Sequence, residues 1–297
     1  MKPKLFLQTV SIMISLIAIF THQCFAQNTG ESKIIDFEGH FVKSSINGKS
    51  YQLCVTVPYE YNMTKDKMYP VLYQLDGIYS FPIIHSTKGI LESQGEIEPV
   101  ITVAIADSIL SPVVFMSSRY YDFMPINDKK QDSILSTQSG LPKEIVVSGG
   151  SDEFIATLEN DLIPFIDRLY RTNGDNGLAG HSAGGLFAAY CLFKKPLLFE
   201  RYAINSPALQ WKNDFLLDLA DEFFITKKKL NKKKVLISIA ENDSPDIRRT
   251  YFDFKNLIEK KQHGSDISFI EFPNESHNSV IPGSISKTLT ILYGKDL

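Results

Sequence analysis

The feature that most constrains the fold is a series of short apolar runs separated by segments with helical periodicity. The runs are residues 71–75, 100–106, 201–204, 235–240 and 267–272. Strands without polar alternation are typical of a sheet that is buried on both faces. Between residues 154 and 169, apolar side chains instead recur every three or four positions, as in an amphipathic helix. The alternation predicts an α/β fold with a mostly parallel central sheet and helices on both faces.

The amino-terminal half should add two features to this sheet. Residues 34–42 and 51–57 are rich in β-branched and aromatic residues, and Asn47-Gly48 lies between them, which predicts an antiparallel hairpin. Residues 127–151 are polar and predict a surface insertion that acts as a lid. No repeat or low-complexity linker divides the rest, so we expect one domain over residues 27–297.

The first 26 residues have the layout of a secretory signal peptide. Lys2 and Lys4 give a positive start, residues 5–20 are largely apolar, and a polar region follows that ends in Ala26. We predict cleavage after Ala26, with an exported product that is periplasmic or secreted and not stably inserted in a membrane. The alternative is an uncleaved anchor, for which the apolar segment is short.

Export bears on Cys54 and Cys191, the two cysteines left after cleavage. A disulfide is compatible with an oxidising compartment, but two separately buried free cysteines are favoured, because free cysteine is often a core residue. The formal net charge of -3 provides no basic field for nucleic acid. The sequence leaves the oligomeric state open.

Gly180-His181-Ser182-Ala183-Gly184 fits the pattern of a nucleophile elbow. In this pattern the serine sits on a sharp turn between a strand and a helix, and the flanking glycines keep side chains out of the turn. Residues 177–179 precede the motif as a short strand, and the helix-forming residues 185–190 follow it. We therefore predict that Ser182 is a nucleophile.

A serine hydroxyl needs a base, and in this pattern the acid and then the histidine follow the serine along the chain. Only His263 and His277 lie late enough. His263 precedes the last predicted strand and should point to the wrong end of the sheet. His277 lies five residues past residue 272, where a loop at the carboxyl end can bring it over Ser182.

The acid should follow the strand predicted at residues 235–240. Glu241, Asp243 and Asp246 all qualify. Asp243 is favoured, because a loop can turn its short side chain toward His277. Glu241 is the main alternative, and Asp246 suits the first turn of a helix.

The oxyanion hole needs two backbone N–H donors. Ala183 follows the nucleophile and should supply one of them. The turn at Gly77 and Ile78, after the third predicted strand, should supply the other.

Six segments through most of the chain form a specific set. They are residues 69–77, 119–125, 148–150, 180–187, 205–207 and 275–282. In these segments the chain resembles the esterase D-like family of α/β-hydrolases, especially its enterochelin (siderophore) esterase-like bacterial branch. The resemblance implies the α/β-hydrolase fold and hydrolysis of carboxylic esters through an acyl-enzyme, with no cofactor and no metal. Relatives cleave siderophore trilactones, cinnamoyl esters, thioesters and simple acyl esters.

The resemblance also bears on single residues. Residues 240–243 are similar to the cinnamoyl esterase segment that ends in the triad acid, which supports Asp243. Arg119 and Asp122 match the family's Arg-x-x-Asp spacing, which implies that Arg119 holds an anionic or catecholate substrate. The favoured alternative is an ion pair that fixes the start of the lid. Trp211 keeps half of a tryptophan pair that many relatives carry beside the pocket.

These features predict a serine carboxylesterase with a Ser-His-Asp triad, acting on a small-molecule ester. One alternative is an acyltransferase with the same triad. Another is a siderophore-trilactone esterase that uses Ser182 and His277 alone, since some members of the siderophore branch lack the acid. A binding module without activity would be indicated by a missing serine, histidine or glycine, and none is missing.

Overall fold

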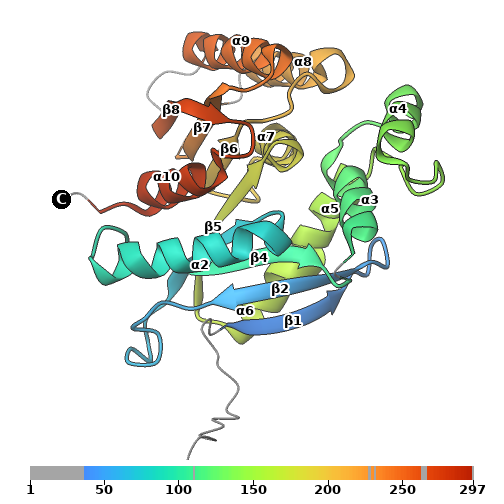
Figure 1. Ribbon diagram of the computed structural model, residues 1–297. Coiled ribbons are helices and arrows are strands. Elements are labelled where there is room, and N and C mark those ends of the chain that lie inside the picture. The colour runs from blue at the N-terminus through green and yellow to red at the C-terminus, as the bar shows by residue number, and fades with distance from the viewer. Residues whose placement is uncertain (1–36, 110, 227–228, 231, 262–265, 296–297) are drawn as a thin grey trace, which may run out of the picture. The chain divides into compact units, whose positions relative to one another are not determined.

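The computed structural model describes residues 37–297, apart from residues 110, 227–228, 231, 262–265 and 296–297. The predicted signal peptide and the start of the strand predicted at residues 34–42 lie outside the described residues. An eight-stranded sheet with the order β1-β2-β4-β3-β5-β6-β7-β8 organises the described part of the chain (Figure 1). The strands are β1 (Glu38–Lys43), β2 (Ser50–Thr56), β3 (Tyr69–Gln74), β4 (Ile101–Asp107), β5 (Thr172–His181), β6 (Arg201–Asn205), β7 (Lys234–Asn242) and β8 (Asp266–Ser276).

The sheet confirms the predicted topology. β1 pairs antiparallel with β2 across the turn at Gly48, where φ is +71°, and β2 pairs antiparallel with β4. Strands β3 to β8 are all parallel. Every residue of β3 is buried, as are the first six of β4, which is why these strands read as continuous apolar runs.

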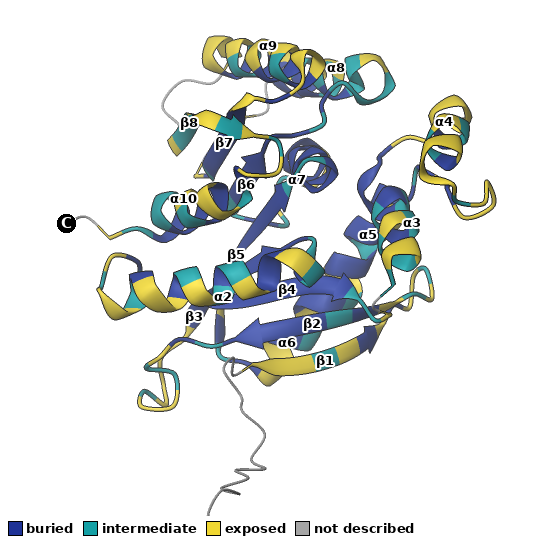
Figure 2. Cartoon of the chain, in the orientation of Figure 1, coloured by how far each residue is buried: buried dark blue, intermediate teal, exposed yellow. Residues whose placement is uncertain are grey.

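Helices cover both faces of the sheet. They are α2 (Gly77–Ser93), α3 (Pro112–Phe123), α4 (Lys129–Ser139), α5 (Ser151–Thr157), α6 (Ile163–Leu169), α7 (Ala183–Lys194), α8 (Trp211–Ile225), α9 (Pro245–Lys261) and α10 (Ile281–Tyr293). Helices α2 and α10 pack with Leu72, Ala179 and Leu236 in one core. Helices α5 to α9 pack in a larger core on the other face, which includes Leu178 and Tyr202 (Figure 2). Neighbouring strand residues thus serve opposite cores.

The helix predicted at residues 154–169 is interrupted. A π-helical turn, η1 (Leu158–Leu162), lies between α5 and α6. Within this turn the Asp161 carboxylate accepts hydrogen bonds from the Ser45 N–H at 2.8 Å and from the Ser44 hydroxyl at 3.1 Å, both in the β1–β2 turn. Local widening of a helix re-aims a side chain without ending the helix.

The predicted lid at residues 127–151 contains a helix of its own. Asp128 caps α4 by accepting hydrogen bonds from the N–H groups of Lys130 and Gln131. The helix ends at Gly140, where φ is +68°, and most of its surface is exposed (Figure 2). Cys54 and Cys191 are both buried and free, so the disulfide alternative is wrong. Within the described residues, no helix combines the length and apolar character that a membrane crossing requires.

Candidate active site

Ser182 occupies a strained turn between β5 and α7. Its φ is +59° and its ψ is −115°, a conformation that non-glycine residues rarely adopt. Ser182 N–H donates to the Asn205 carbonyl at 3.0 Å, and Ala208 N–H donates to the Ser182 carbonyl at 3.1 Å. The loop after β6 therefore holds the turn from both sides, and the hydroxyl projects at the carboxyl edge of the sheet.

Glycines make room for this turn. A Cβ at Gly180 would collide with the Gly184 carbonyl oxygen. A Cβ at Gly185 would lie 2.8 Å from the Asn205 carbonyl oxygen. Gly185 stands outside the five-residue motif, so the pattern alone did not mark it as necessary.

His277 bridges Ser182 and Asp243. Its Nε2 lies 2.9 Å from Ser182 Oγ, and its Nδ1 lies 2.5 Å from Asp243 Oδ1. β7 and β8 run further than their apolar cores and pair Asn242 with Ser276. Asp243 and His277 directly follow these two residues, so strand register brings them side by side. The expected five-residue gap between the last strand and His277 is wrong, because β8 continues to Ser276.

The Asp243 side chain is fully buried yet well supplied with donors. Burial raises the pKa of Asp243, but hydrogen bonds from His277, Ser206 and the Ala240 N–H outweigh burial and leave the pKa lowered. An ionised carboxylate can accept the His277 Nδ1–H and stabilise an imidazolium. Among the other candidates, Glu241 accepts a hydrogen bond from Asn274 N–H at 2.6 Å, and Asp246 lies in the first turn of α9.

Two helix amino termini meet beside Ser182. Ala183 begins α7 and Gly77 begins α2, and the first N–H groups of a helix have no acceptor within it. A Cβ at Gly184 would lie 3.3 Å from Asp76 Oδ2, so the two turns are in contact. The predicted oxyanion donors Ala183, Gly77 and Ile78 thus lie in the first turns of two neighbouring helices, whose dipoles both favour a negative charge at that end.

Arg119 and Asp122 do not pair with each other. Arg119 Nε donates to Asp76 Oδ1 at 2.7 Å, and its Nη2 donates to the His181 carbonyl at 3.2 Å. Asp122 is 3% exposed and binds Lys49 Nζ at 2.8 Å and the Tyr51 hydroxyl at 3.1 Å. The expected Arg119–Asp122 ion pair is therefore wrong. Asp122 is also poorly placed to contact a substrate, because its carboxylate is buried and bound to Lys49 and Tyr51 at the start of β2.

Trp211 connects the lid to the loop after β6. Its Nε1 donates to the Ile126 carbonyl at 3.2 Å, and its ring lies edge-on to Tyr120 at 5.7 Å. The next residue, Lys212, forms an ion pair with Asp128 at 3.2 Å. Trp211 is partly exposed.

His181 is a site residue that the sequence did not single out. Its ring centroid lies 4.7 Å from that of His277. Burial, followed by the nearby charges of His277 and Arg119, lowers the pKa of His181 to about 3. The His181 ring is therefore neutral at neutral pH and packs beside the His277 ring without adding a positive charge to the site. Its place inside the elbow motif was the available signal.

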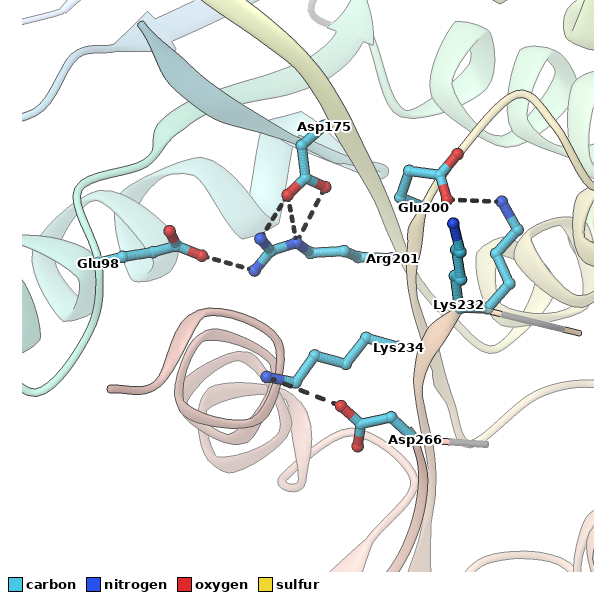
Figure 3. A pocket seen from close by; sticks show the side chains of 8 residues that line it. Glu98, Asp175, Glu200, Arg201, Lys232, Lys234 and Asp266 are labelled. Atoms are coloured by element: carbon cyan, nitrogen blue, oxygen red, sulfur yellow. Dashed lines mark hydrogen bonds and ion pairs between the residues drawn. The ribbon is translucent and has the colours of Figure 1, made fainter. Parts of the chain in front are cut away.

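Two cavities lie at opposite edges of the sheet. One of about 200 Å³ adjoins His181 and Arg119 and is lined by Tyr79, Phe115 and Ile285 among others, on α2, α3 and α10. A larger cavity of about 580 Å³ lies at the amino ends of β6, β7 and β8 (Figure 3). In the lining of the larger cavity, Arg201 pairs with Asp175 and Glu98, Lys233 with Glu200, and Lys234 with Asp266. The polar groups around Ser182 make the carboxyl edge the candidate site.

Comparison with known proteins agrees with this geometry. A model of the family described as "Putative esterase" matches residues 44–254. The ferri-bacillibactin esterase BesA of Bacillus subtilis is 31% identical over 77% of this chain and 80% of its own length. A siderophore enterobactin esterase of Emericella nidulans is 32% identical over 58% of each chain. An IroE-like serine hydrolase from Shewanella oneidensis superposes with a TM-score of 0.75 at 26% identity, covering 87% of this chain and 80% of its own. The chain belongs to this esterase family, among its enterochelin esterase-like members, and is a serine hydrolase that acts on carboxylic ester bonds.

Proposed function

We propose that Ser182, His277 and Asp243 form the catalytic triad of this esterase. The observation that carries the proposal is the unbroken chain from Ser182 Oγ through the His277 ring to Asp243, with contacts of 2.9 Å and 2.5 Å. The buried, ionised Asp243 favours a full triad over the dyad alternative. An acid that orients the imidazole also stabilises the charge that the imidazole gains in the transition state.

The reaction follows from these contacts. His277 Nε2 takes the Ser182 hydroxyl proton as Oγ attacks the ester carbonyl, and the amides of Ala183 and the Gly77–Ile78 turn receive the negative oxygen. The tetrahedral intermediate collapses when the alcohol leaves with the proton from His277. Water then attacks the acyl-enzyme and gives a proton to His277. As the bond from the acyl carbon to Oγ breaks, His277 passes this proton to Ser182 Oγ, and the carboxylic acid is released.

We propose a siderophore ester as the natural substrate. The names of two relatives support this choice, since both are esterases of siderophore-type compounds. The surroundings of the site are also suitable, because Tyr79, Phe115 and Trp211 offer ring faces and edges on which aromatic acyl groups can pack. The apolar leader supports an exported enzyme that meets its substrate outside the cytoplasm.

A fluorophosphonate probe tests the nucleophile. We expect the intact mass of the mature protein to rise by one adduct and Ser182→Ala to abolish it. Ser93→Ala is the matched control, because Ser93 is exposed at the end of α2 and donates only to the Ile90 carbonyl. Labelling that persists in Ser182→Ala would remove Ser182 from the mechanism.

Substrate class is tested by comparing kcat/KM for a catecholate trilactone, with and without iron(III), against methyl ferulate and p-nitrophenyl butyrate. We expect the trilactone to be preferred by at least about tenfold, because several ring contacts add binding energy that a short ester cannot use. A clear preference for methyl ferulate or the simple ester would overturn the siderophore assignment but leave the serine mechanism intact.

A further inference from the structure

The Arg119 guanidinium joins the two turns that supply the oxyanion hole. Nε and Nη2 reach the two carboxylate oxygens of Asp76 at 2.7 Å and 3.2 Å. Nη2 also donates to the His181 carbonyl at 3.2 Å. Asp76 directly precedes Gly77, and His181 is separated from Ala183 only by Ser182. One planar group therefore fixes the residues next to both sets of predicted oxyanion donors.

The Asp76 side chain is oriented outward to meet this guanidinium. Asp76 stands at the N-cap of α2, where its backbone is left-handed with φ +57° and ψ +42°. An N-cap aspartate usually accepts hydrogen bonds from its own helix, yet this side chain makes no such bond. Its carboxylate instead lies against the first turn of α7, close to Gly184. The left-handed backbone and the missing cap hydrogen bond are local costs that the Arg119 contact offsets.

The guanidinium is itself held in place. Arg119 lies on α3, which packs on α7, and its guanidinium carbon lies 5.7 Å from the centroid of the Phe123 ring. The side chains of Arg119 and Asp76 are 19% and 15% exposed. A planar, five-donor group in a fixed position can span two acceptors that a flexible ammonium cannot.

We propose that Arg119 is a positioning residue that sets the spacing of the oxyanion hole, acting through Asp76 and the His181 carbonyl. This inference rests on the proposed serine mechanism. Arg119 acts on geometry and also on charge. The Asp76 carboxylate lies beside the place where negative charge develops, and Arg119 neutralises it. Without Arg119 the hole would loosen and would face an uncompensated carboxylate.

This role differs from that of a substrate anchor. The hydrogen bonds that Arg119 donates through Nε and Nη2 go to Asp76 and to the His181 carbonyl, so these two nitrogens are committed to the protein. A positioning role affects the transition state of every ester, including neutral ones. A substrate anchor would affect only the binding of negatively charged esters.

The test uses four variants of the mature enzyme: Arg119→Ala, Arg119→Lys, Asp76→Asn and the double variant Arg119→Ala/Asp76→Asn. For each, kcat and KM are measured with neutral p-nitrophenyl butyrate and with a p-nitrophenyl ester that carries a carboxylate on its acyl chain. The inhibition constant of a neutral trifluoromethyl ketone is measured as well, because its serine adduct places an oxyanion in the hole. Arg168→Ala is the matched control, since Arg168 lies on α6 in contact with the Phe165 ring. Circular dichroism verifies folding.

We expect Arg119→Ala to lower kcat by about a hundredfold with KM within about threefold, as for loss of one oxyanion donor. Ketone affinity should fall in parallel. Arg119→Lys should lose about tenfold in kcat. The kcat of the double variant should be at least about threefold higher than that of Arg119→Ala, because Asp76→Asn removes the carboxylate charge that Arg119→Ala leaves without a partner. If Arg119→Ala does not fold, Arg119→Lys and Asp76→Asn carry the same test.

Unchanged kcat and ketone affinity in folded Arg119 variants would overturn the inference. A loss confined to the KM of negatively charged esters would also overturn it and make Arg119 a substrate anchor. If the wild-type enzyme hydrolyses none of the esters and takes no fluorophosphonate label, the proposed serine mechanism itself fails. This result differs from failure of the Arg119 inference, in which the wild-type enzyme is active and labelled.

Discussion

The amino and carboxyl edges of the sheet differ in how far their polar groups satisfy one another. At the amino edge, the larger cavity of about 580 Å³ is lined by pairs such as Arg201 with Asp175 and Glu98, and Lys233 with Glu200 (Figure 3). Each of these charges has a neighbour of opposite sign. At the carboxyl edge, the cavity of about 200 Å³ is smaller and is also bordered by an ion pair, Arg119 with Asp76. Beside it, however, lie Ser182 in a strained turn and His181, whose lowered pKa keeps it neutral.

The difference teaches where chemistry is to be sought in this molecule. Ion pairs that satisfy one another hold strand ends together and leave little capacity for a ligand. Ser182 in a strained turn, His181 with a strongly lowered pKa, and two uncapped helix termini represent local costs. Such costs gather at functional sites, whereas cavity volume alone would have selected the wrong edge.

The largest expected effect separates the acid from its neighbours at the carboxyl edge. Asp243→Asn should lower kcat by about a thousandfold or more, because His277 then loses the acceptor that fixes its tautomer. Glu241→Gln and Asp246→Asn should each cost less than about tenfold, since Glu241 bonds to Asn274 N–H and Asp246 only begins α9. Steady-state kinetics with p-nitrophenyl butyrate provide the measurement.

Two other outcomes of this series are informative. If Glu241→Gln is the damaging change, Glu241 is the acid and the 2.5 Å contact of Asp243 has only a structural role. If no single change lowers kcat by more than about tenfold, the site works as a dyad of Ser182 and His277.

The second prediction concerns the neutral histidine at the same edge. The pKa of His181 is about 3 in the folded protein, against 6.5 for the ordinary group. Below pH 6.5 the unfolded chain binds a proton that the folded protein does not. The unfolding free energy is therefore unaffected by His181 above pH 6.5. As the pH falls from 6.5 toward 3, His181 lowers it by up to about 1.4 kcal/mol per pH unit.

His181→Phe keeps an aromatic ring beside His277 and removes the titration. Urea unfolding between pH 6.5 and 4 should therefore show a flatter dependence of the unfolding free energy on pH in the variant than in the wild type. Equal slopes would mean that folding does not lower the pKa of His181, and the contrast between local costs at the carboxyl edge and satisfied ion pairs at the amino edge would weaken.

Most of the sheet could be predicted because its central strands are buried on both faces and therefore read as apolar runs. The same reasoning placed Ser182 and His277 near each other, since both follow parallel strands and meet at one edge. The sequence reasoning underestimated the length of β8, whose last residues are polar and exposed because β8 is the outermost strand of the sheet. Apolar patterning does not detect such an extension.

The partners of Arg119 could not be predicted in this way. Sequence spacing suggested Asp122, one helical turn away, but the guanidinium reaches Asp76, which is 43 residues distant. Such a choice depends on how α3 packs over α7 and on the register of β3 beside β5. The π-helical turn at Leu158–Leu162 was missed as well, and its Asp161 contacts the β1–β2 turn, which is more than 100 residues away in the sequence.

The smallest effect on activity is expected from a substitution at the amino edge. It tests most directly whether the amino edge is structural and the carboxyl edge chemical. Arg201 binds Asp175 and Glu98, donates to the Leu292 carbonyl and lies over the Tyr293 ring, with its guanidinium carbon 4.4 Å from the ring centroid. Arg201→Met should lower the unfolding free energy by about 2 kcal/mol, because it leaves two carboxylates without their cation in a partly exposed place. The kcat and KM of the folded variant should change by less than about twofold, since no contact of Arg201 reaches the carboxyl edge. Chemical denaturation and ester kinetics on the same preparation separate the two quantities. A tenfold fall in kcat without loss of stability would give the amino-edge cavity a role in turnover, and the division between a structural and a chemical edge would not hold.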